Sequence, residues 1–356
     1  MMVTSILHLM KQARYVKSVM KKCGHLLSPG KYHIFDNFRS VCLEKTEIRN
    51  QAKRYFGFPS RTRLRVYIAR ILNGLHYFSV SEGRSCGTYE AIYLANNHDK
   101  DREAKLFSFT DRKILTLCTS RDEMCRQLGE YEMLHGAYKM PRVEKSDEFE
   151  NALVVAMIQR LKFPGNAQAL TAIAQAEMEN FRSTADLPRR PVEELIRFSY
   201  SDETMTTCLS ALAQQISRDL LSCSFPLCMQ HGDLSKDNLI FGESEGETAF
   251  WWIDWEHIGD RVFFYDYFFY VINSAVYNDT GAFACYISGQ NDEVLNQYFA
   301  HFGIDFDPGK KWDYFMIFAI VFLKERVCDL GHVSALVRYC RMLENLRGNM
   351  DKGVTT

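Results

Sequence analysis

The segment His231-Gly-Asp-Leu-Ser-Lys-Asp-Asn238 places a carboxylate, Asp233, five positions before a carboxamide, Asn238. A second acidic residue, Asp254, follows 16 positions later, after two short apolar runs separated by a glycine-bearing turn. A chain that turns back over this length brings Asp254 beside Asn238, so that oxygen atoms of both can face one magnesium ion. Asp233 is then available to orient a hydroxyl group. The pattern predicts phosphoryl transfer, in which a protein mainly positions the reactants and neutralises charge.

The segment also resembles a known family. His231-Gly-Asp-Leu-Ser-Lys-Asp-Asn-Leu-Ile240, followed by Ile253-Asp-Trp-Glu256, Gly259 and Tyr265-Asp266, looks like the aminoglycoside phosphotransferase and choline kinase-like family. That family has a two-lobed protein-kinase-like fold. The likeness is strong over about 231–267, is limited to the order of strands and turns over 72–161, and is silent about 1–60.

The resemblance implies a role for each residue of the motif. Asp233 would be the catalytic base or the carboxylate that orients the acceptor, and Asn238 and Asp254 would bind magnesium. His231 would brace the catalytic loop, and Asp266 would be a structural brace farther along the chain. The implied cofactors are ATP and Mg²⁺.

A protein kinase is a weaker interpretation, although the spacing H-x-D-x-x-x-x-N matches the catalytic loop of protein kinases. Ser235 stands where Ser/Thr protein kinases usually carry lysine, and Lys236 comes one position later. Asp254-Trp-Glu replaces the Asp-Phe-Gly triplet, and no Ala-Pro-Glu segment follows it. A docked protein substrate would therefore lack a platform.

The elements that must position the nucleotide are predicted upstream. Runs at 76–81, 88–94, 104–109 and 113–119 indicate a small antiparallel sheet. Gly83 and Gly87 lie in the turn between the first two runs, where backbone amides could approach phosphates. Because a glycine pair in a hairpin is often only a turn, both interpretations stay open.

The lysine that would hold the ATP phosphates is Lys105 or Lys113. Counting strands after the glycine turn favours Lys105, whereas adjacency to the following helix favours Lys113. That helix is predicted to begin at Thr119 or Ser120, either of which can cap it. It would supply Glu130 as the acidic partner, with Glu132 or Glu123 as alternatives.

The apolar run Asn151–Leu161 predicts a buried strand that leads into Lys162-Phe-Pro-Gly165, a candidate hinge. Backbone groups of Met157, Ile158 and Gln159 would then bind the adenine. From residue 166 onward the pattern is mostly helical, with helices expected at Ala167–Phe181, Pro191–Phe198 and Glu203–Cys223.

These elements define an α+β fold in two lobes. We expect a basic, mainly helical N-terminal extension over 1–70, an N-lobe with a small antiparallel sheet and a helix over 71–162, and a helical C-lobe with the catalytic loop and metal site over 163–350.

Composition sets the remaining expectations. The chain has 356 residues, 47% hydrophobic and 24% charged, with a net charge of −1, which is typical of a folded globular protein. The 11 cysteines include no C-x-x-C pair, which indicates reduced thiols in a cytoplasmic protein. Neither long apolar run, 262–276 or 314–323, is long enough for a membrane span. We expect no nucleic-acid partner.

Charge is distributed unevenly along the chain. Residues 1–70 carry 15 Lys and Arg against 3 Asp and Glu. Residues 1–60 could therefore contact an anionic glycan or the inner face of a membrane. The alternative is a solvated basic face of a helix packed on the main body, which is the more common outcome for a run of charge.

The same asymmetry leaves the acceptor open. An acidic remainder would suit cationic amines, such as aminoglycosides, choline or ethanolamine. The basic N-terminal segment suits a sugar of a cell-surface glycan precursor instead, and we favour this small-molecule or sugar acceptor. A non-catalytic pseudokinase that only binds ligands is the second class of function, and the joint presence of Asp233, Asn238 and Asp254 argues against it.

Overall fold

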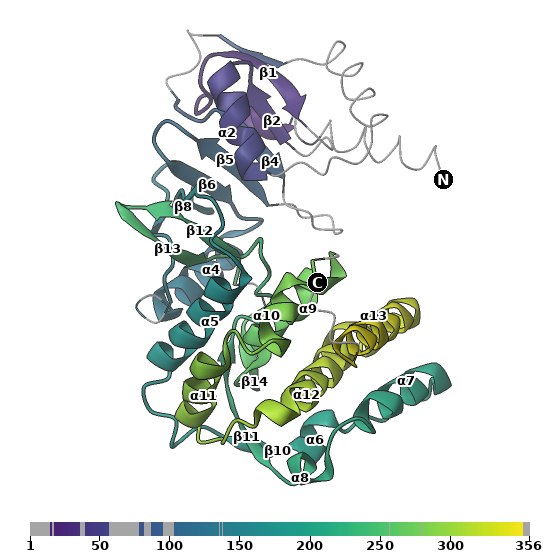
Figure 1. Ribbon diagram of the computed structural model, residues 1–356. Helices are drawn as coiled ribbons and strands as arrows, with labels where there is room; N and C mark the ends of the chain where they lie inside the picture. Colours follow the sequence, from purple (N-terminus) through teal and green to yellow (C-terminus); the bar gives the residue numbers. More distant parts are fainter. Residues whose placement is uncertain are drawn as a thin grey trace. The chain divides into compact units, whose positions relative to one another are not determined.

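The computed structural model describes residues 15, 18–35, 40–56, 78–81, 87–94, 103–134, 136, 138–255, 257–277 and 279–351. The chain forms two compact units, which are drawn in Figure 1. Unit 1 comprises Met1–His135, Met140–Lys162 and Gly242–Ala249. Unit 2 comprises Gly136–Lys139, Phe163–Phe241 and Phe250–Thr356.

Unit 1 is built on an antiparallel sheet of eight strands in the order β3-β1-β2-β4-β5-β6-β8-β7. These strands are β1 Gly30–Phe35, β2 Ser40–Leu43, β3 Phe78–Val80, β4 Ala91–Leu94, β5 Ala104–Ser108, β6 Lys113–Leu117, β7 Val143–Lys145 and β8 Ala152–Ala156. The predicted α+β fold class, with an antiparallel sheet and a mainly helical second part, is confirmed.

The N-terminal part of unit 1 differs from the prediction. Residues 1–70 were expected to form a mainly helical extension, but β1 and β2 lie inside the sheet, paired with each other and with β3 and β4. The four residues of β2 are all buried. The surplus of Lys and Arg suggested a solvated helix, whereas charge reports exposure and not the type of secondary structure.

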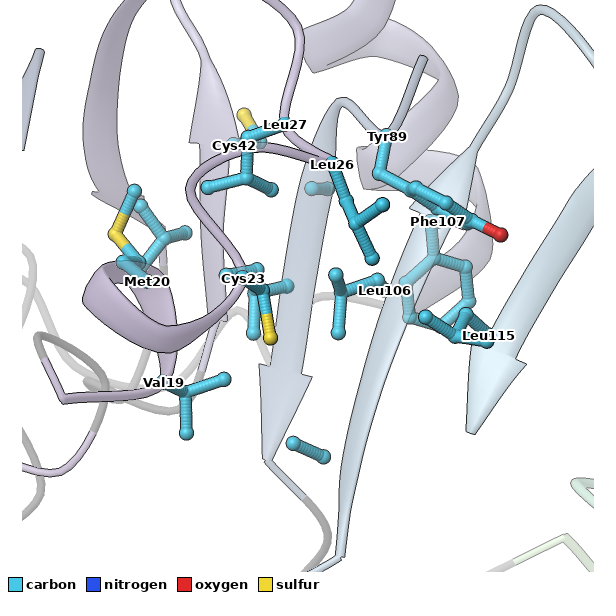
Figure 2. Packing of buried hydrophobic residues seen from close by; sticks show 14 of the residues in the cluster. Val19, Met20, Cys23, Leu26, Leu27, Cys42, Tyr89, Leu106, Phe107 and Leu115 are labelled. Atoms are coloured by element: carbon cyan, nitrogen blue, oxygen red, sulfur yellow. The ribbon is translucent and has the colours of Figure 1, made fainter. Parts of the chain in front are cut away.

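The residues before β1 also belong to this unit. Figure 2 shows Val19, Met20, Cys23, Leu26 and Leu27 packed against side chains of the sheet. Each of the five is less than 10% exposed. Their apolar surface is thus used inside unit 1, which favours the expectation of a basic face packed on the main body over the described part of this segment.

Helices α2 and α4 pack against the sheet. Helix α2 (Thr46–Phe56) packs against β2, and α4 (Arg121–Leu134) packs against β7 and β8. The predicted cap of α4 is confirmed, because the Ser120 Oγ accepts a hydrogen bond from the Glu123 amide at 3.1 Å. Acidic side chains in the first turn further stabilise this helix start.

Unit 2 is mainly helical. Its helices are α5 Asn166–Asn180, α6 Val192–Ile196, α7 Glu203–Ala213, α8 Arg218–Leu221, α9 Tyr265–Val276, α10 Gly281–Ile287, α11 Asp292–His301, α12 Lys311–Leu323 and α13 Val333–Asp351. A 3-10 turn, η2 (Pro308–Lys310), precedes α12, and a π-helical turn, η3 (Lys324–Cys328), separates α12 from α13.

The expected single helix over 203–223 was wrong. Helix α7 ends at Ala213, and the short α8 begins after Ser217, whose amide donates to the Asp313 Oδ2 at 3.1 Å. The apolar spacing continues across this break, so periodicity alone did not reveal that a tertiary contact starts a new helix.

Outside the eight-stranded sheet, the described residues form six further strands in two small sheets, and the sequence predicted only some of them. Strand β11 (Ser224–Gln230) pairs with β10 (Arg189–Pro191) and β14 (Gly259–Val262), both antiparallel. Strands β12 (Leu239–Ser244) and β13 (Glu247–Trp252) form a sheet with β9 (Gln159–Arg160). The sequence predicted the β12 and β13 strands but missed β11, where Pro226 lies in the middle of the run. Strand β11 leads directly into the loop that carries Asp233.

The core of unit 2 is aromatic. Helices α9 and α12 are buried over nearly their whole surface, and Phe268 of α9 packs against Phe315 and Phe318 of α12. A helix that is apolar on all sides must be covered by others. Within the described residues, no helix has the length and hydropathy needed to traverse a bilayer.

Candidate active site

The predicted catalytic loop connects β11 to β12 and lies wholly in unit 2. Asn238 is buried, and its Nδ2 donates to the Asp233 backbone oxygen at 2.9 Å and to the Asp233 Oδ2 at 3.2 Å. The five-residue spacing therefore closes a tight loop. Because its nitrogen is used internally, the Asn238 amide points its oxygen away from Asp233.

Asp254 follows β13 and returns to the same loop. The Ile253 amide donates to the Asn238 backbone oxygen at 3.0 Å, which places Asp254 next to Asn238 as the spacing predicted. Asp254 has a φ of 68°, a left-handed conformation that residues other than glycine rarely adopt. Its side chain is exposed and makes no hydrogen bond or ion pair with the described residues. Such backbone strain is typical of functional positions.

The two carboxylates and the amide fit a magnesium ion. Magnesium is usually held by one or two carboxylates together with substrate phosphates, and not by a cage of protein ligands. The described residues contain no cluster of three His, Cys, Asp or Glu that could hold a metal. Asn238 and Asp254 would supply two oxygen ligands and leave the others to phosphates.

His231 braces the loop. It is fully buried, its Nδ1 accepts a hydrogen bond from the Asp233 amide at 3.3 Å, and its Nε2 then donates to the Ile253 oxygen at 2.8 Å. One imidazole thus ties Asp233 to the residue before Asp254. Burial lowers the pKa of His231 to about 4, so the ring is neutral at physiological pH. These contacts fit the implied bracing role and not proton transfer.

Asp266 lies beneath the loop at the start of α9. Its carboxylate accepts from the His231 amide at 2.6 Å and from the Gly232 amide at 2.8 Å. The Asp266 amide in turn donates to the Gln230 Oε1 at 3.0 Å. These bonds satisfy two buried loop amides, which matches the structural role implied by the resemblance.

Asp233 is partly buried and carries a perturbed pKa. Burial raises the pKa to about 6, and the charge of Asp254 adds to the increase, while the charge of Arg326 opposes it. At neutral pH the carboxylate is therefore mostly ionised and close to the range that suits a general base. Its position and charge are those needed to orient a hydroxyl group.

Sequence reasoning missed several residues around the loop. Arg326 of η3 donates from its Nη2 to the Gly232 oxygen at 2.7 Å, and Arg261 of β14 donates to the His257 oxygen at 3.0 Å. Glu177 of α5 accepts from Gln230 at 2.9 Å. These residues lie between 4 and 94 positions from their partners, and no spacing rule connects them. Only the folded chain brings them to the loop.

The two glycines predicted to approach phosphates belong to unit 1. Gly83 lies outside the described residues. At Gly87, a Cβ atom would sit 1.8 Å from the Leu26 backbone oxygen, so only glycine fits there. This close approach accounts for Gly87 through packing on the N-terminal segment, and its contact with phosphate stays a prediction.

Lys105 and Lys113 lie next to different acidic residues. Lys105, on β5, lies 3.3 Å from the Glu103 carboxylate, whereas Lys113, on β6, lies 3.2 Å from Asp111. Lys105 is opposite Thr116 of β6, Thr116 is opposite Leu153 of β8, and Leu153 packs with Met124 of α4, so Lys105 lies on the face of the sheet that α4 covers. This placement favours Lys105 as the phosphate-binding lysine.

Glu130, the predicted acidic partner, pairs with a residue of its own helix. Glu130 pairs with Arg126 of its own helix, and Arg126 also pairs with Glu123. The spacing of three and four residues along α4 explains these pairs. The expected pairing of Glu130 with a strand lysine is therefore not present in this structure.

The three residues predicted to bind adenine lie after β8. The Met157 amide donates to the Arg112 oxygen at 2.8 Å and is unavailable to a nucleotide. Ile158 is buried, and Gln159 is part of β9, opposite Glu243 of β12. Adenine binding by this segment stays a prediction, but the Met157 N–H cannot be one of the donors.

Similar proteins are found by comparison of structures and not by comparison of sequences. No family model matches the sequence, and no curated protein matches it either. Solved structures do match. Aminoglycoside 2′-phosphotransferase-IIIa in its GDP complex is 15% identical, with a TM-score of 0.42 over 73% of this chain and 93% of that chain.

Two further structures are similar at the same level. Aminoglycoside phosphotransferase APH(4)-Ia is 12% identical, with a TM-score of 0.43 over 74% of this chain and 94% of that chain. Choline kinase LicA from Streptococcus pneumoniae is 13% identical, with a TM-score of 0.42 over 81% of this chain and 100% of that chain. Because these identities and TM-scores are low, function has to be inferred from the residues of the site.

Proposed function

We propose that this protein is a magnesium-dependent phosphotransferase that moves the γ-phosphoryl group of ATP to a hydroxyl group of a small molecule. The observation that carries the proposal is the closed set formed by Asp233, Asn238 and Asp254. Asn238 bonds directly to Asp233, and the residue before Asp254 bonds to Asn238. This set combines an acceptor-orienting carboxylate with two magnesium ligands.

The chemistry assigned to each side chain follows from its contacts. The Asp233 carboxylate accepts a hydrogen bond from the acceptor hydroxyl and receives its proton. The hydroxyl oxygen forms a bond to the γ-phosphorus, the bond from phosphorus to the β–γ bridging oxygen breaks, and ADP leaves with the electron pair. Asn238 and Asp254 would hold magnesium, which neutralises phosphate charge when bound. His231 and Asp266 keep the loop in place.

Unit 1 would hold the nucleotide. We propose Lys105 for the phosphates and the backbone near Ile158 and Gln159 for the adenine, with Gly83 and Gly87 as further candidates. Lys105 is supported by its position on the α4 side of the sheet.

For the acceptor we propose a sugar hydroxyl and not a cationic amine. The positive charge of Arg326 acts on Asp233, and it would repel an aminoglycoside, choline or ethanolamine group brought to this carboxylate. A sugar carries no charge at the reacting hydroxyl and avoids this cost. A screen of magnesium-dependent ATP consumption over sugars, nucleotide sugars, aminoglycosides and choline-like amines tests the choice. Turnover with the amines alone would reject it.

The enzyme assignment itself is tested by two substitutions. Asp233→Asn should abolish phosphoryl transfer while nucleotide binding persists, because the residue acts on the acceptor. Asp254→Asn should weaken magnesium-dependent ATP binding by about tenfold or more, since it removes a charged ligand. Isothermal titration with and without magnesium, beside a turnover assay, separates the two effects. A wild-type protein that neither binds ATP with magnesium nor turns it over would be a binding module of another kind.

A further inference from the structure

The π-helical turn η3 presents Arg326 to the catalytic loop. Turns of this kind are rare and frequently occur at functional sites. Arg326 lies in this turn, and its Nη2 donates to the oxygen of Gly232, the residue immediately before Asp233, at 2.7 Å. The Arg326 guanidinium group is therefore held beside the backbone from which the Asp233 side chain extends.

Arg326 is near Asp233 without being neutralised by it. Its positive charge opposes the increase in the Asp233 pKa. In the described part of the chain, however, the two side chains form no ion pair; Arg326 donates to the Gly232 oxygen and also interacts with the Tyr265 hydroxyl. A guanidinium group carries five N–H donors, so these two contacts leave donors for another group.

Other cations near the loop are already engaged. Lys236 pairs with Asp279, and Lys324 donates to the Leu195 oxygen at 2.7 Å. Arg261 pairs with Glu325 at 3.0 Å and donates to two backbone oxygens. Position 235, where Ser/Thr protein kinases usually carry lysine, holds a serine. Arg326 is thus the cation that acts on Asp233 and has donors to spare.

We infer that Arg326 is a further catalytic residue, whose guanidinium group binds the phosphoryl group while it is transferred beside Asp233. This inference rests on the proposed function. In the transition state, negative charge is spread over the three equatorial oxygens of the phosphoryl group. A planar guanidinium group matches two such oxygens with parallel N–H donors, which an ammonium group cannot do.

The experiment needs no knowledge of the natural acceptor, because water can take its place. In that reaction a water oxygen bonds to the γ-phosphorus, the bond to the bridging oxygen breaks, and ADP, inorganic phosphate and a proton are released. Magnesium-dependent ATP hydrolysis is measured in single turnovers for the full chain, together with the dissociation constant of the magnesium complex of AMP-PNP and the melting temperature.

Three variants are compared. Arg326→Met should slow hydrolysis by about 100-fold or more, as expected for loss of a charged donor to the transition state. Arg326→Lys should recover part of the rate, because it keeps the charge but not the paired donors. Lys324→Met is the matched control: it removes a cation from the same turn that also donates to one backbone oxygen, and its rate should stay near that of the wild type.

Nucleotide affinity and melting temperature decide between binding and bracing. If Arg326 binds the phosphoryl group, Arg326→Met lowers the rate far more than it changes AMP-PNP affinity, and its melting temperature stays close to that of Lys324→Met. Equal rates in the two methionine variants would overturn the inference. So would a loss of rate matched by an equal loss of affinity and thermal stability, which would reduce Arg326 to a brace for the loop.

The remaining outcomes separate this inference from the proposed function. If hydrolysis is unchanged in Arg326→Met while KM for a sugar phosphate rises, the residue binds an anionic acceptor and not the transferred group. If the wild type lacks magnesium-dependent ATP binding and turnover, the proposed function fails first, and the inference fails with it.

Discussion

Two left-handed backbone positions, Gly232 and Asp254, shape the site at the scale of single residues. Gly232 has a φ of 78° and Asp254 a φ of 68°. A Cβ atom at Gly232 would lie 2.3 Å from the His257 oxygen and 2.7 Å from the Arg261 Nη1. The loop before Asp233 therefore depends on glycine both for its conformation and for space.

Replacement of Gly232 by alanine should be costly for this double reason. Gly246, in the turn between β12 and β13, offers a matched control, because its φ of 82° is similar but a Cβ atom there meets nothing within 4 Å. Each alanine substitution should lower the free energy of unfolding by about 1–3 kcal/mol because of backbone strain. Gly232→Ala should lower it further, and should also lower turnover, because the contact with His257 displaces the loop.

Chemical denaturation gives the free energy of unfolding for both variants, and the turnover assay shows the effect on the site. Equal destabilisation of Gly232→Ala and Gly246→Ala would contradict the role assigned to the close contact. Normal turnover in Gly232→Ala would contradict the dependence of Asp233 on this loop conformation.

At the scale of elements, α5 supports the catalytic loop through a buried polar chain. The Glu177 carboxyl of α5 contacts the Tyr138 hydroxyl at 3.0 Å and the Gln230 Nε2 at 2.9 Å, and Gln230 contacts the Asp266 amide. Burial raises the pKa of Glu177 well above its ordinary value of 4.5, and the nearby charge of Asp266 adds to this increase. Glu177 is thus protonated in the folded state at pH values where a free glutamate is ionised.

This protonation makes folding stability depend on pH. Between pH 4.5 and the folded-state pKa, the folded protein binds more protons at Glu177 than the unfolded chain, so stability falls as pH rises. Glu177→Gln removes this loss while keeping one acceptor and a donor. Its stability relative to the wild type should rise as the pH increases above 4.5, by up to about 1.4 kcal/mol per pH unit, until Glu177 ionises in the folded wild type.

Urea denaturation at several pH values measures this difference directly. Glu179→Gln on the same helix is the control, because Glu179 is exposed and its variant should follow the wild-type curve at each pH. Parallel curves for Glu177→Gln and the wild type would show that Glu177 is ionised in the folded state, contrary to the expectation.

At the scale of the whole molecule, the N-terminal segment is part of unit 1. Met20, Cys23 and Leu27 pack in the core of the sheet unit, and β1 and β2 supply two of its strands (Figure 2). Removal of residues 1–60 would therefore expose that core and unfold the unit. The predicted contact of this segment with an anionic surface therefore has to be tested by replacing charged side chains and not by truncation.

Lys21 and Lys22 are exposed, and neither belongs to the core, although the Lys22 ammonium lies 5.6 Å from the centre of the Phe149 ring. If the segment contacts anionic membranes, the wild type should bind vesicles that contain phosphatidylserine at low salt. A Lys21→Glu, Lys22→Glu variant should bind at least tenfold more weakly, since each lysine contributes about 1 kcal/mol at such a surface.

A variant with Lys145→Glu and Lys162→Glu changes two other exposed lysines of unit 1 and serves as the control. Sedimentation with vesicles measures the bound fraction. If the wild type stays unbound at low salt, or if both double variants weaken binding equally, the N-terminal segment makes no specific contact with the surface.

The sequence by itself determined the local parts of this protein. The spacing of Asp233, Asn238 and Asp254 predicted their meeting, because a short turn between two strands leaves the chain few ways to return. Several elements could also be predicted, because their formation depends mainly on residues close in the sequence. They are the helices at 121–134 and 166–180 and the strands at 104–108 and 113–117.

The tertiary structure alone decided which distant residues support that site. Arg326 of η3 and Glu177 of α5 reach the loop from elements that are distant in the sequence, whereas Asp266 was already implied by the resemblance. Strands β1 and β2 likewise join a sheet that the sequence did not predict for them. Local propensity carries no information about such partners, because these contacts form only when the core of each unit packs. The carboxylates at 233 and 254 could thus be predicted from one stretch of sequence, whereas the cation that acts on Asp233 could not.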